Sequence, residues 1–214
     1  IHDGPESVAK TLRGRYRRDG GLIAFDKLPT DIWAQMRKAV AKGVSRVYVI
    51  GQGTAGVAAV GIAHLIERTT GQDSRLDIPV LALRSSEMSG EIESYDFRNS
   101  LVIAVSQSGT TTDTNRAVDL ARERGATIHA IVNRRNSDLV RKADSVLFTS
   151  DGRDVEMSVA STKAFYSQLT AGKLTALFLA DALNTMTDVE IAYEMGELER
   201  LPALIGEVLG TEAE

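Results

Sequence analysis

Cysteine is absent from this chain of 214 residues, which excludes both a disulfide framework and a thiolate metal site. Histidine is scarce, with three residues, and no spacing among histidine, aspartate and glutamate residues indicates a metal site. An excess of basic residues is also missing, because the net charge is −4, so we expect no nucleic-acid partner. No apolar run is long enough to cross a bilayer, and we expect a cytoplasmic chain without membrane contact or signal peptide.

Five short apolar runs are typical of buried strands: 47–50, 80–83, 101–105, 128–132 and 146–148. Helical periodicity fills most of the gaps, over 32–40, 55–67, 112–124, 161–183 and 190–209. This alternation predicts an α/β fold with a doubly wound, flavodoxin-like, parallel five-stranded sheet flanked by helices. We expect an N-terminal helical extension over 1–43, the sheet domain over 44–185 and a C-terminal helix over 186–214.

Hydroxyl residues and a glycine, Ser106 to Thr114, directly follow the apolar run 101–105 and precede a helix. The start of a helix offers free N–H groups and a positive dipole end, where an oxyanion can bind. The groups able to contact phosphate are the side chains of Ser106, Gln107, Ser108 and Thr111 and the backbone near Gly109. The alternative is a capped helix start that serves only the protein's own backbone. One hydroxyl would suffice for a cap, so we favour a phosphate site.

A second candidate is the glycine turn Gly51 to Gly56, again between a strand and a helix. We rank three interpretations of it. The first is a loop that closes, together with the loop at Ser106, on one small phosphorylated ligand. The second is a tight turn that needs glycine for packing, and the third is a dinucleotide fingerprint with Arg84 as a partner for a 2′-phosphate.

A third segment runs from Glu156 to Phe165, where small and hydroxyl residues begin a long helix. Its free N–H groups again offer a place for a ligand, whereas the alternative is an ordinary helix cap by Ser158 or Ser161. Spacing alone leaves both open.

These segments, in this order, resemble the sugar isomerase (SIS) domain of glutamine:fructose-6-phosphate aminotransferases, the glucosamine-6-phosphate synthases, and in particular the first of their two SIS domains. The matching motifs are 106–109, Thr111 with 113–114, and Glu156 with 159–165. The resemblance extends to 5–7, 11–15, 99–101 and 201–202, and so covers nearly the whole chain.

The resemblance implies a role for each matching position. The phosphate of fructose 6-phosphate or glucosamine 6-phosphate is expected to lie on Thr54, Ser106, Gln107, Ser108 and Thr111. The sugar is expected to lie against Val159, Ala160 and Ser161. Lys163 and Glu156 belong to the motif and are expected to have structural roles, although Lys163 is also compatible with a Schiff base or a phosphate contact. Two positions depart from the family pattern, Ala55 in place of serine and Thr110 in place of glutamate.

Catalysis in the family needs groups that this chain does not supply. Isomerisation moves a proton between C1 and C2 of the sugar, and the resemblance assigns the groups for it to a second SIS domain and to a histidine of the neighbouring subunit. We therefore expect no catalytic residue, cofactor or metal in this chain. We also expect the second SIS domain and a glutaminase domain, whose nucleophile is a cysteine, elsewhere in a longer protein.

The expected function is thus the sugar-phosphate-binding part of a glucosamine-6-phosphate synthase-like isomerase, an incomplete enzyme that forms a homodimer. The alternatives are a sugar-phosphate sensor without catalysis and a single-domain isomerase completed by dimerisation. His64 and His129 are expected to be packed or surface side chains. The basic run 13–18 is expected to be a solvated helix end.

Overall fold

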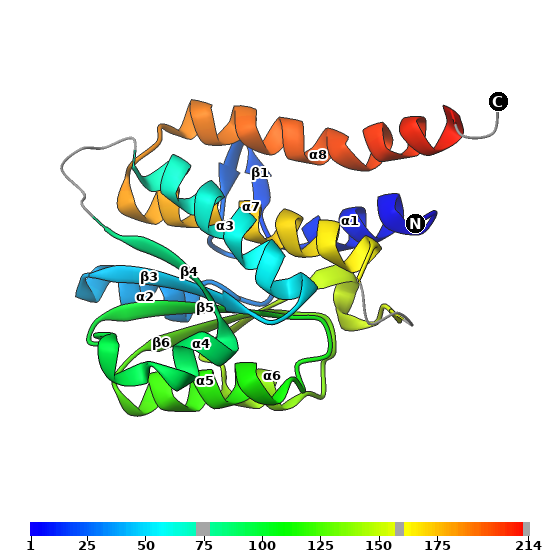
Figure 1. Cartoon of the computed structure of the whole chain (residues 1–214). Coiled ribbons are helices and arrows are strands. Elements are labelled where there is room, and N and C mark those ends of the chain that lie inside the picture. Colours follow the sequence, from blue (N-terminus) through cyan, green and yellow to red (C-terminus); the bar gives the residue numbers. More distant parts are fainter. Residues whose placement is uncertain (72–77, 157–160, 212–214) are drawn as a thin grey trace.

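The computed structural model describes residues 1–71, 78–156 and 161–211. Its centre is a parallel sheet with the strand order β4-β3-β5-β6-β7 (Figure 1). The strands are β3 (Arg46–Gly51), β4 (Val80–Arg84), β5 (Ser100–Ser106), β6 (Thr127–Val132) and β7 (Ser145–Phe148). Strand β4 lies at one edge, beside β3, and β5, β6 and β7 follow in order on the other side of β3. This is the flavodoxin-like order, which confirms the predicted fold class.

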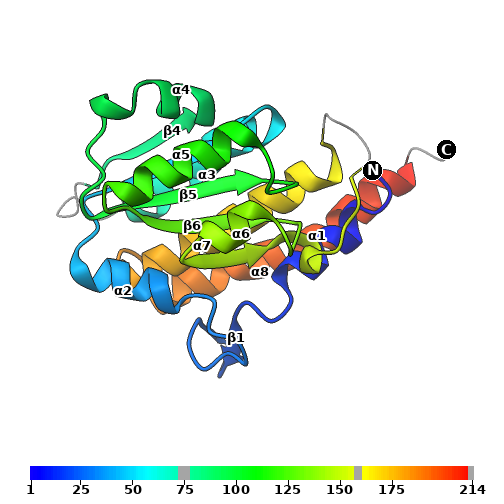
Figure 2. The same cartoon turned by 90° about the horizontal axis from the view of Figure 1, so that it is seen from below.

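Helices cover both faces of the sheet because alternate strand residues are apolar on each side. Val47 and Val49 of β3 pack in the core beneath α2 (Ala34–Lys42), α3 (Thr54–Thr70) and α7 (Lys163–Leu183). Tyr48 and Ile50 face the other core, under α4 (Ser85–Gly90), α5 (Thr112–Glu123) and α6 (Asp138–Lys142) (Figure 2). Every residue of the central strand β5 is buried, so its carboxyl end is rigidly placed.

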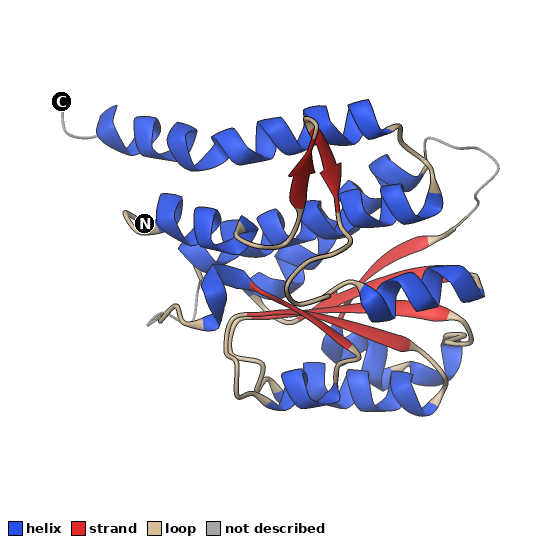
Figure 3. Ribbon diagram, turned by 180° about the vertical axis from the view of Figure 1, so that it is seen from behind, coloured by secondary structure: helices blue, strands red, loops and turns tan. Residues whose placement is uncertain are grey.

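Two further helices pack outside this arrangement. The N-terminal helix α1 (Gly4–Leu12) and the long C-terminal helix α8 (Asp188–Gly210) contact one another and α7, and α8 is the outermost layer in Figure 1. A short antiparallel hairpin of β1 (Arg17–Asp19) and β2 (Leu22–Ala24) lies against α8 (Figure 3).

The hairpin corrects one sequence-based prediction. The basic run 13–18 was expected to be a solvated helix end within a helical extension, but Arg17 and Arg18 lie in β1. Both strands are only three residues long, and the guanidinium of Arg18 donates from Nε to the Glu199 carboxylate at 3.1 Å. The segment before α2 is therefore partly β structure, and the ion pair between Arg18 and Glu199 joins it to α8.

The long predicted elements are present with small shifts at their ends. For example, α2 begins at Ala34 and not at residue 32, and α7 begins at Lys163 and not at residue 161. The short helices α4 and α6 and the 3₁₀ turns η1 (Ile92–Ser94) and η2 (Thr149–Gly152) were not predicted. Within the described ranges, no helix combines the length and the apolar character needed to span a bilayer.

Candidate functional site

The sheet reverses its winding direction between β3 and β5. These neighbouring strands are followed by helices on opposite faces of the sheet, α3 after β3 and α5 after β5. Ligands of such sheets bind at the carboxyl ends of the strands at this switch point. The glycine turn and the loop of residues 106–111, the hydroxyl loop, both lie at this point. Thr54 is the first residue of α3, and Thr111 is the residue that precedes α5.

The hydroxyl loop folds on itself through its serines. Ser106 Oγ accepts a hydrogen bond from the Gly109 N–H at 2.9 Å. Ser108 Oγ accepts from the Thr110 N–H at 3.2 Å and from the Thr110 hydroxyl at 3.0 Å. A hydroxyl that accepts still has its own proton to donate. Both serines can therefore hold the loop and donate to a bound oxyanion at the same time.

The start of α5 carries no side-chain cap. Thr111 occupies the capping position, but its side chain makes no capping hydrogen bond. Instead Asn115 Nδ2 donates to the carbonyl groups of Gly109 and Thr111, at 3.1 and 3.0 Å, and pins the loop to the helix. The first-turn N–H groups therefore lack the cap that the alternative interpretation required. One acidic side chain, Asp113, lies in this turn.

The glycine turn is shaped by close packing. A Cβ on Gly51 would lie 2.5 Å from the Ala55 carbonyl oxygen, and one on Gly56 would lie 3.1 Å from the Gly51 carbonyl oxygen. Gly53 has φ of +59°, in the left-handed region that favours glycine. Packing and backbone conformation account for all three glycines, as the second of the three interpretations proposed. A ligand contact at Thr54 is compatible with this turn but is not needed to explain it.

The third segment lies partly outside the described residues, because Val159, Ala160 and the possible cap Ser158 belong to 157–160. Ser161 is half-buried and lies two residues before α7. The Glu156 carboxylate accepts hydrogen bonds from the N–H groups of Thr162 and Ala164, at 3.4 and 3.5 Å. Glu156 therefore caps α7.

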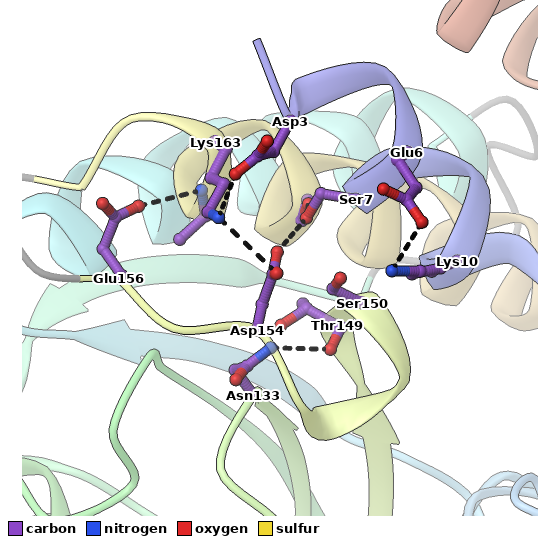
Figure 4. Close-up of polar contacts among 12 residues, drawn as sticks. Asp3, Glu6, Ser7, Lys10, Asn133, Thr149, Ser150, Asp154, Glu156 and Lys163 are labelled. Carbon is purple, nitrogen blue, oxygen red and sulfur yellow. Dashed lines mark hydrogen bonds and ion pairs between the residues drawn. The ribbon is translucent and has the colours of Figure 1, made fainter. Parts of the chain in front are cut away.

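Lys163 is held in ion pairs within the chain. Its Nζ lies 2.9 Å from the Asp3 carboxylate and 3.5 Å from that of Asp154 (Figure 4). The hydrogen bond to Asp3 raises the pKa of Lys163, which keeps the ammonium charged. A charged amine is a poor nucleophile, so this geometry favours the structural role over a Schiff base.

Helix α1 braces the segment that follows η2. Ser7 Oγ donates to the Asp154 carboxylate at 2.8 Å, and Thr11 Oγ1 accepts from the Ser150 N–H at 2.9 Å. Ser150, Asp151 and Gly152 all have positive φ, with values of 46°, 56° and 70°. These contacts fix a left-handed turn that directs the chain toward Glu156.

A cleft with a volume of about 410 Å³ lies between the hydroxyl loop and this segment. It is lined by Gln107, Ser108, Asn133, Arg134, Gly152, Arg153, Asp154, Val155 and Glu156. The structure thus brings two predicted phosphate contacts, Gln107 and Ser108, beside the chain that leads to Ser161. Thr54, Ser106 and Thr111 are not part of this lining.

Sequence reasoning missed Asn133, Arg134, Arg153 and Asp154 as neighbours of the hydroxyl loop. A signal for the first two was available, because they directly follow the apolar run 128–132, and ligands bind at the carboxyl ends of parallel strands. Asn133 Nδ2 donates to the Thr149 carbonyl oxygen at 2.9 Å, so this residue joins the ends of β6 and β7 (Figure 4).

Neither His64 nor His129 lines the cleft. His129 is fully buried, stacks on Trp33 and shares a 2.8 Å hydrogen bond with Ser145 Oγ, and burial lowers its pKa to about 3. The His64 side chain is 86% exposed. One is packed and the other is on the surface, as predicted. Among the described residues, no group of three His, Asp or Glu side chains is arranged to hold a metal ion.

Comparison with known proteins shows what the chain is similar to. A family model described as the SIS domain matches residues 42–178. Glutamine–fructose-6-phosphate aminotransferases [isomerizing] from Corynebacterium efficiens and Mycolicibacterium paratuberculosis are 37% and 36% identical over 99% of the chain. The C-terminal domain of glucosamine-fructose-6-phosphate aminotransferase from Francisella tularensis superposes with a TM-score of 0.84 at 27% identity, over 99% of this chain and 55% of that one.

The chain spans only 32% and 31% of the length of those two aminotransferases. The family match, in contrast, extends over more than half of the chain and includes the whole parallel sheet, both loops at its switch point and most of α7. The chain belongs to the SIS domain family.

Proposed function

We propose that this SIS domain binds a hexose 6-phosphate and is the sugar-phosphate-binding part of a glucosamine-6-phosphate synthase-like enzyme, as the first of two SIS domains. The observation that carries the proposal is the uncapped start of α5 beside the Ser106–Thr111 loop, at the switch point of the sheet. The identity to glutamine–fructose-6-phosphate aminotransferases supports fructose 6-phosphate as the substrate and glucosamine 6-phosphate as the product.

The proposed contacts divide between the two ends of the ligand. The phosphate receives O–H donors from Ser106, Ser108 and Thr111 and an N–H from Gln107, with Thr54 contributing from the start of α3. The sugar lies toward the start of α7, against Ser161 and the preceding residues 159 and 160. The cleft supports this orientation, because it extends from Ser108 of the hydroxyl loop to Glu156, which caps α7.

We propose further that the catalytic groups come from outside this chain. Proton transfer between C1 and C2 needs a base free to move a proton near the sugar. The two carboxylates that line the cleft are already engaged, Glu156 with the start of α7 and Asp154 with Ser7 and Lys163. A second SIS domain, a neighbouring subunit and a glutaminase domain would supply the base, the ring-opening group and the ammonia, without a cofactor.

A groove with exposed apolar side chains supports association with a second SIS domain or a second copy. It lies between α3, β4 and α7 and has a volume of about 910 Å³. Val57 and Val60 of α3 line it and are 62% and 60% exposed, which is high for valine. A homodimer would bury these side chains.

Isothermal titration of the chain with fructose 6-phosphate, beside fructose and inorganic phosphate, tests the proposal. We expect saturable binding of the phosphorylated sugar, much weaker binding of both fragments, and loss of binding in Ser108→Ala. Ser94→Ala is the matched control and should bind normally, because this exposed serine lies in η1, before the amino end of β5, whereas the loop follows the carboxyl end. Binding that survives Ser108→Ala unchanged would place the ligand elsewhere.

A further inference from the structure

Two arginine side chains line the cleft. Arg134 follows β6 and Arg153 follows η2, and both are exposed. Among residues 1–71, 78–156 and 161–211, neither guanidinium has a hydrogen-bond or ion-pair partner. The two carboxylates of the cleft are already engaged, Asp154 with Ser7 and Lys163, and Glu156 with the start of α7. The cleft therefore has cationic charge available to a ligand.

The backbone of Arg134 contacts the hydroxyl loop directly. β6 is the neighbour of β5 in the sheet, and the backbone N–H groups of Asn133 and Arg134 both donate to the Gln107 carbonyl oxygen at 3.3 Å. The Arg134 side chain then lines the same cleft as Ser108. These contacts anchor the base of the side chain beside the loop, and they do not depend on which side chain the residue carries.

The hydroxyl loop has no charge of its own to offer a phosphate. A phosphate monoester carries about −1.5 to −2 charges at neutral pH, whereas Ser106 to Thr112 are all neutral. The helix dipole of α5 provides only about half a positive charge, and Asp113 in the first turn opposes it. Ala55 also lacks a hydroxyl where the resembling family has serine. A nearby guanidinium would neutralise the ligand, and its planar fork matches phosphate oxygens in a bidentate contact.

We propose that Arg134 is a phosphate-binding residue of this site, and that it makes the cleft select a dianionic phosphate monoester over a monoanionic ester of the same shape. The assignment rests on the proposed hexose phosphate function and adds its charge specificity. It also explains how the site tolerates the change at Ala55, because a charge-assisted contact replaces a neutral hydroxyl donor.

Titration with fructose 6-phosphate and with fructose 6-sulfate tests this assignment, because the two esters differ mainly in charge. In Arg134→Gln we expect affinity for the phosphate to fall by about tenfold or more. Affinity for the sulfate should fall less, so that the preference for phosphate narrows. Arg134→Lys keeps the charge without the fork and should retain part of the preference. Arg122→Gln, at the opposite end of α5, removes the same charge as the matched control.

Several outcomes would overturn the assignment. One is equal affinity of Arg134→Gln and Arg122→Gln for fructose 6-phosphate. Another is a loss of affinity in Arg134→Gln by the same factor for both esters, as a merely structural role predicts. Urea unfolding of each variant establishes that it is folded. If the unaltered chain binds neither ester, the proposed function fails together with the assignment. If it binds both and loses them in Ser108→Ala, while Arg134→Gln changes nothing, only the assignment fails.

Discussion

Gly109, at the centre of the hydroxyl loop, should not tolerate even a methyl group. Its φ of +66° is in the left-handed region, and a Cβ there would lie 2.1 Å from Ser137 Oγ and 2.6 Å from Ser137 Cβ. A matched control is Gly125, which follows the C-terminal end of α5. Its φ is +94°, and a Cβ there would meet no neighbouring atom within 4 Å. At both sites alanine is strained because φ is positive. Only Gly109→Ala adds a steric collision with Ser137.

The size of each effect follows from these two terms. A non-glycine residue in the left-handed region costs about 1–2 kcal/mol, and overpacking a buried site costs about 1–3 kcal/mol. We expect Gly125→Ala to lower the free energy of unfolding by about 1–2 kcal/mol and Gly109→Ala by about 2–5 kcal/mol. Ser137→Gly removes both colliding atoms, and alone it should cost only a few tenths of a kcal/mol, because Ser137 makes no capping hydrogen bond.

Urea unfolding of the four variants, including Gly109→Ala with Ser137→Gly, measures these terms. The double variant should recover most of the collision part but none of the backbone part, which gives a favourable coupling in the double-mutant cycle. The reasoning is refuted if Gly109→Ala is no more destabilised than Gly125→Ala, or if Ser137→Gly fails to rescue it. Fructose 6-phosphate binding should be lost in Gly109→Ala and kept in Gly125→Ala.

Three further predictions concern stability. Well above pH 6.5 His129 is neutral in both the folded and the unfolded chain. As the pH falls from 7 to 5, only the unfolded chain takes up the proton. The free energy of unfolding should therefore fall by about 2 kcal/mol more in the parent chain than in His129→Gln. Gly172→Ala should cost about 1–3 kcal/mol despite better helix propensity, because its Cβ would lie 2.2 Å from Ile62 Cγ1. Thr187→Ala should cost about 1 kcal/mol by removing the capping box of α8, which Thr187→Ser preserves.

Each of these has an outcome that would contradict it in urea unfolding. Equal pH dependence in the parent chain and in His129→Gln would mean that the buried imidazole titrates normally. A stabilised Gly172→Ala would show that α3 and α7 separate without penalty. If Thr187→Ser is as unstable as Thr187→Ala, the hydroxyl at this position does not stabilise α8.

The sheet could be predicted because its strands are buried on both faces. Five apolar residues in succession, as in 101–105, are hard to place anywhere but in a covered parallel strand. The hairpin could not be predicted in the same way. Arg17 and Asp19 are charged, both strands are three residues long, and only Ile23 of the second strand is buried. Neither strand has the alternating pattern that identifies a half-buried strand.

The candidate site was predictable in position but not in its surroundings. The spacing of the hydroxyl loop after 101–105 placed it at a sheet edge, where the structure has it. The bracing of Asp154 by Ser7 joins residues 147 positions apart, and no local pattern encodes such a contact. Arg134 adjoins the loop only because β5 and β6 are neighbours. The ligand roles of Thr54, Ser106, Gln107, Ser108, Thr111, Val159, Ala160 and Ser161 stay predictions.

The bracing of the cleft by α1 has a consequence for the order in which the chain folds. Thr11 and Ser7 bond to Ser150, Asp154 and Ser167, which come 139, 147 and 160 residues later. At a synthesis rate of about 5–20 residues per second, α1 leaves the ribosome on the order of 10 seconds before its partners exist. Closing so long a loop is slow, because its entropy is lost before the contacts form. Helix α1 is therefore made well before its partners but is placed only after them, and the wall of the cleft is completed when it docks.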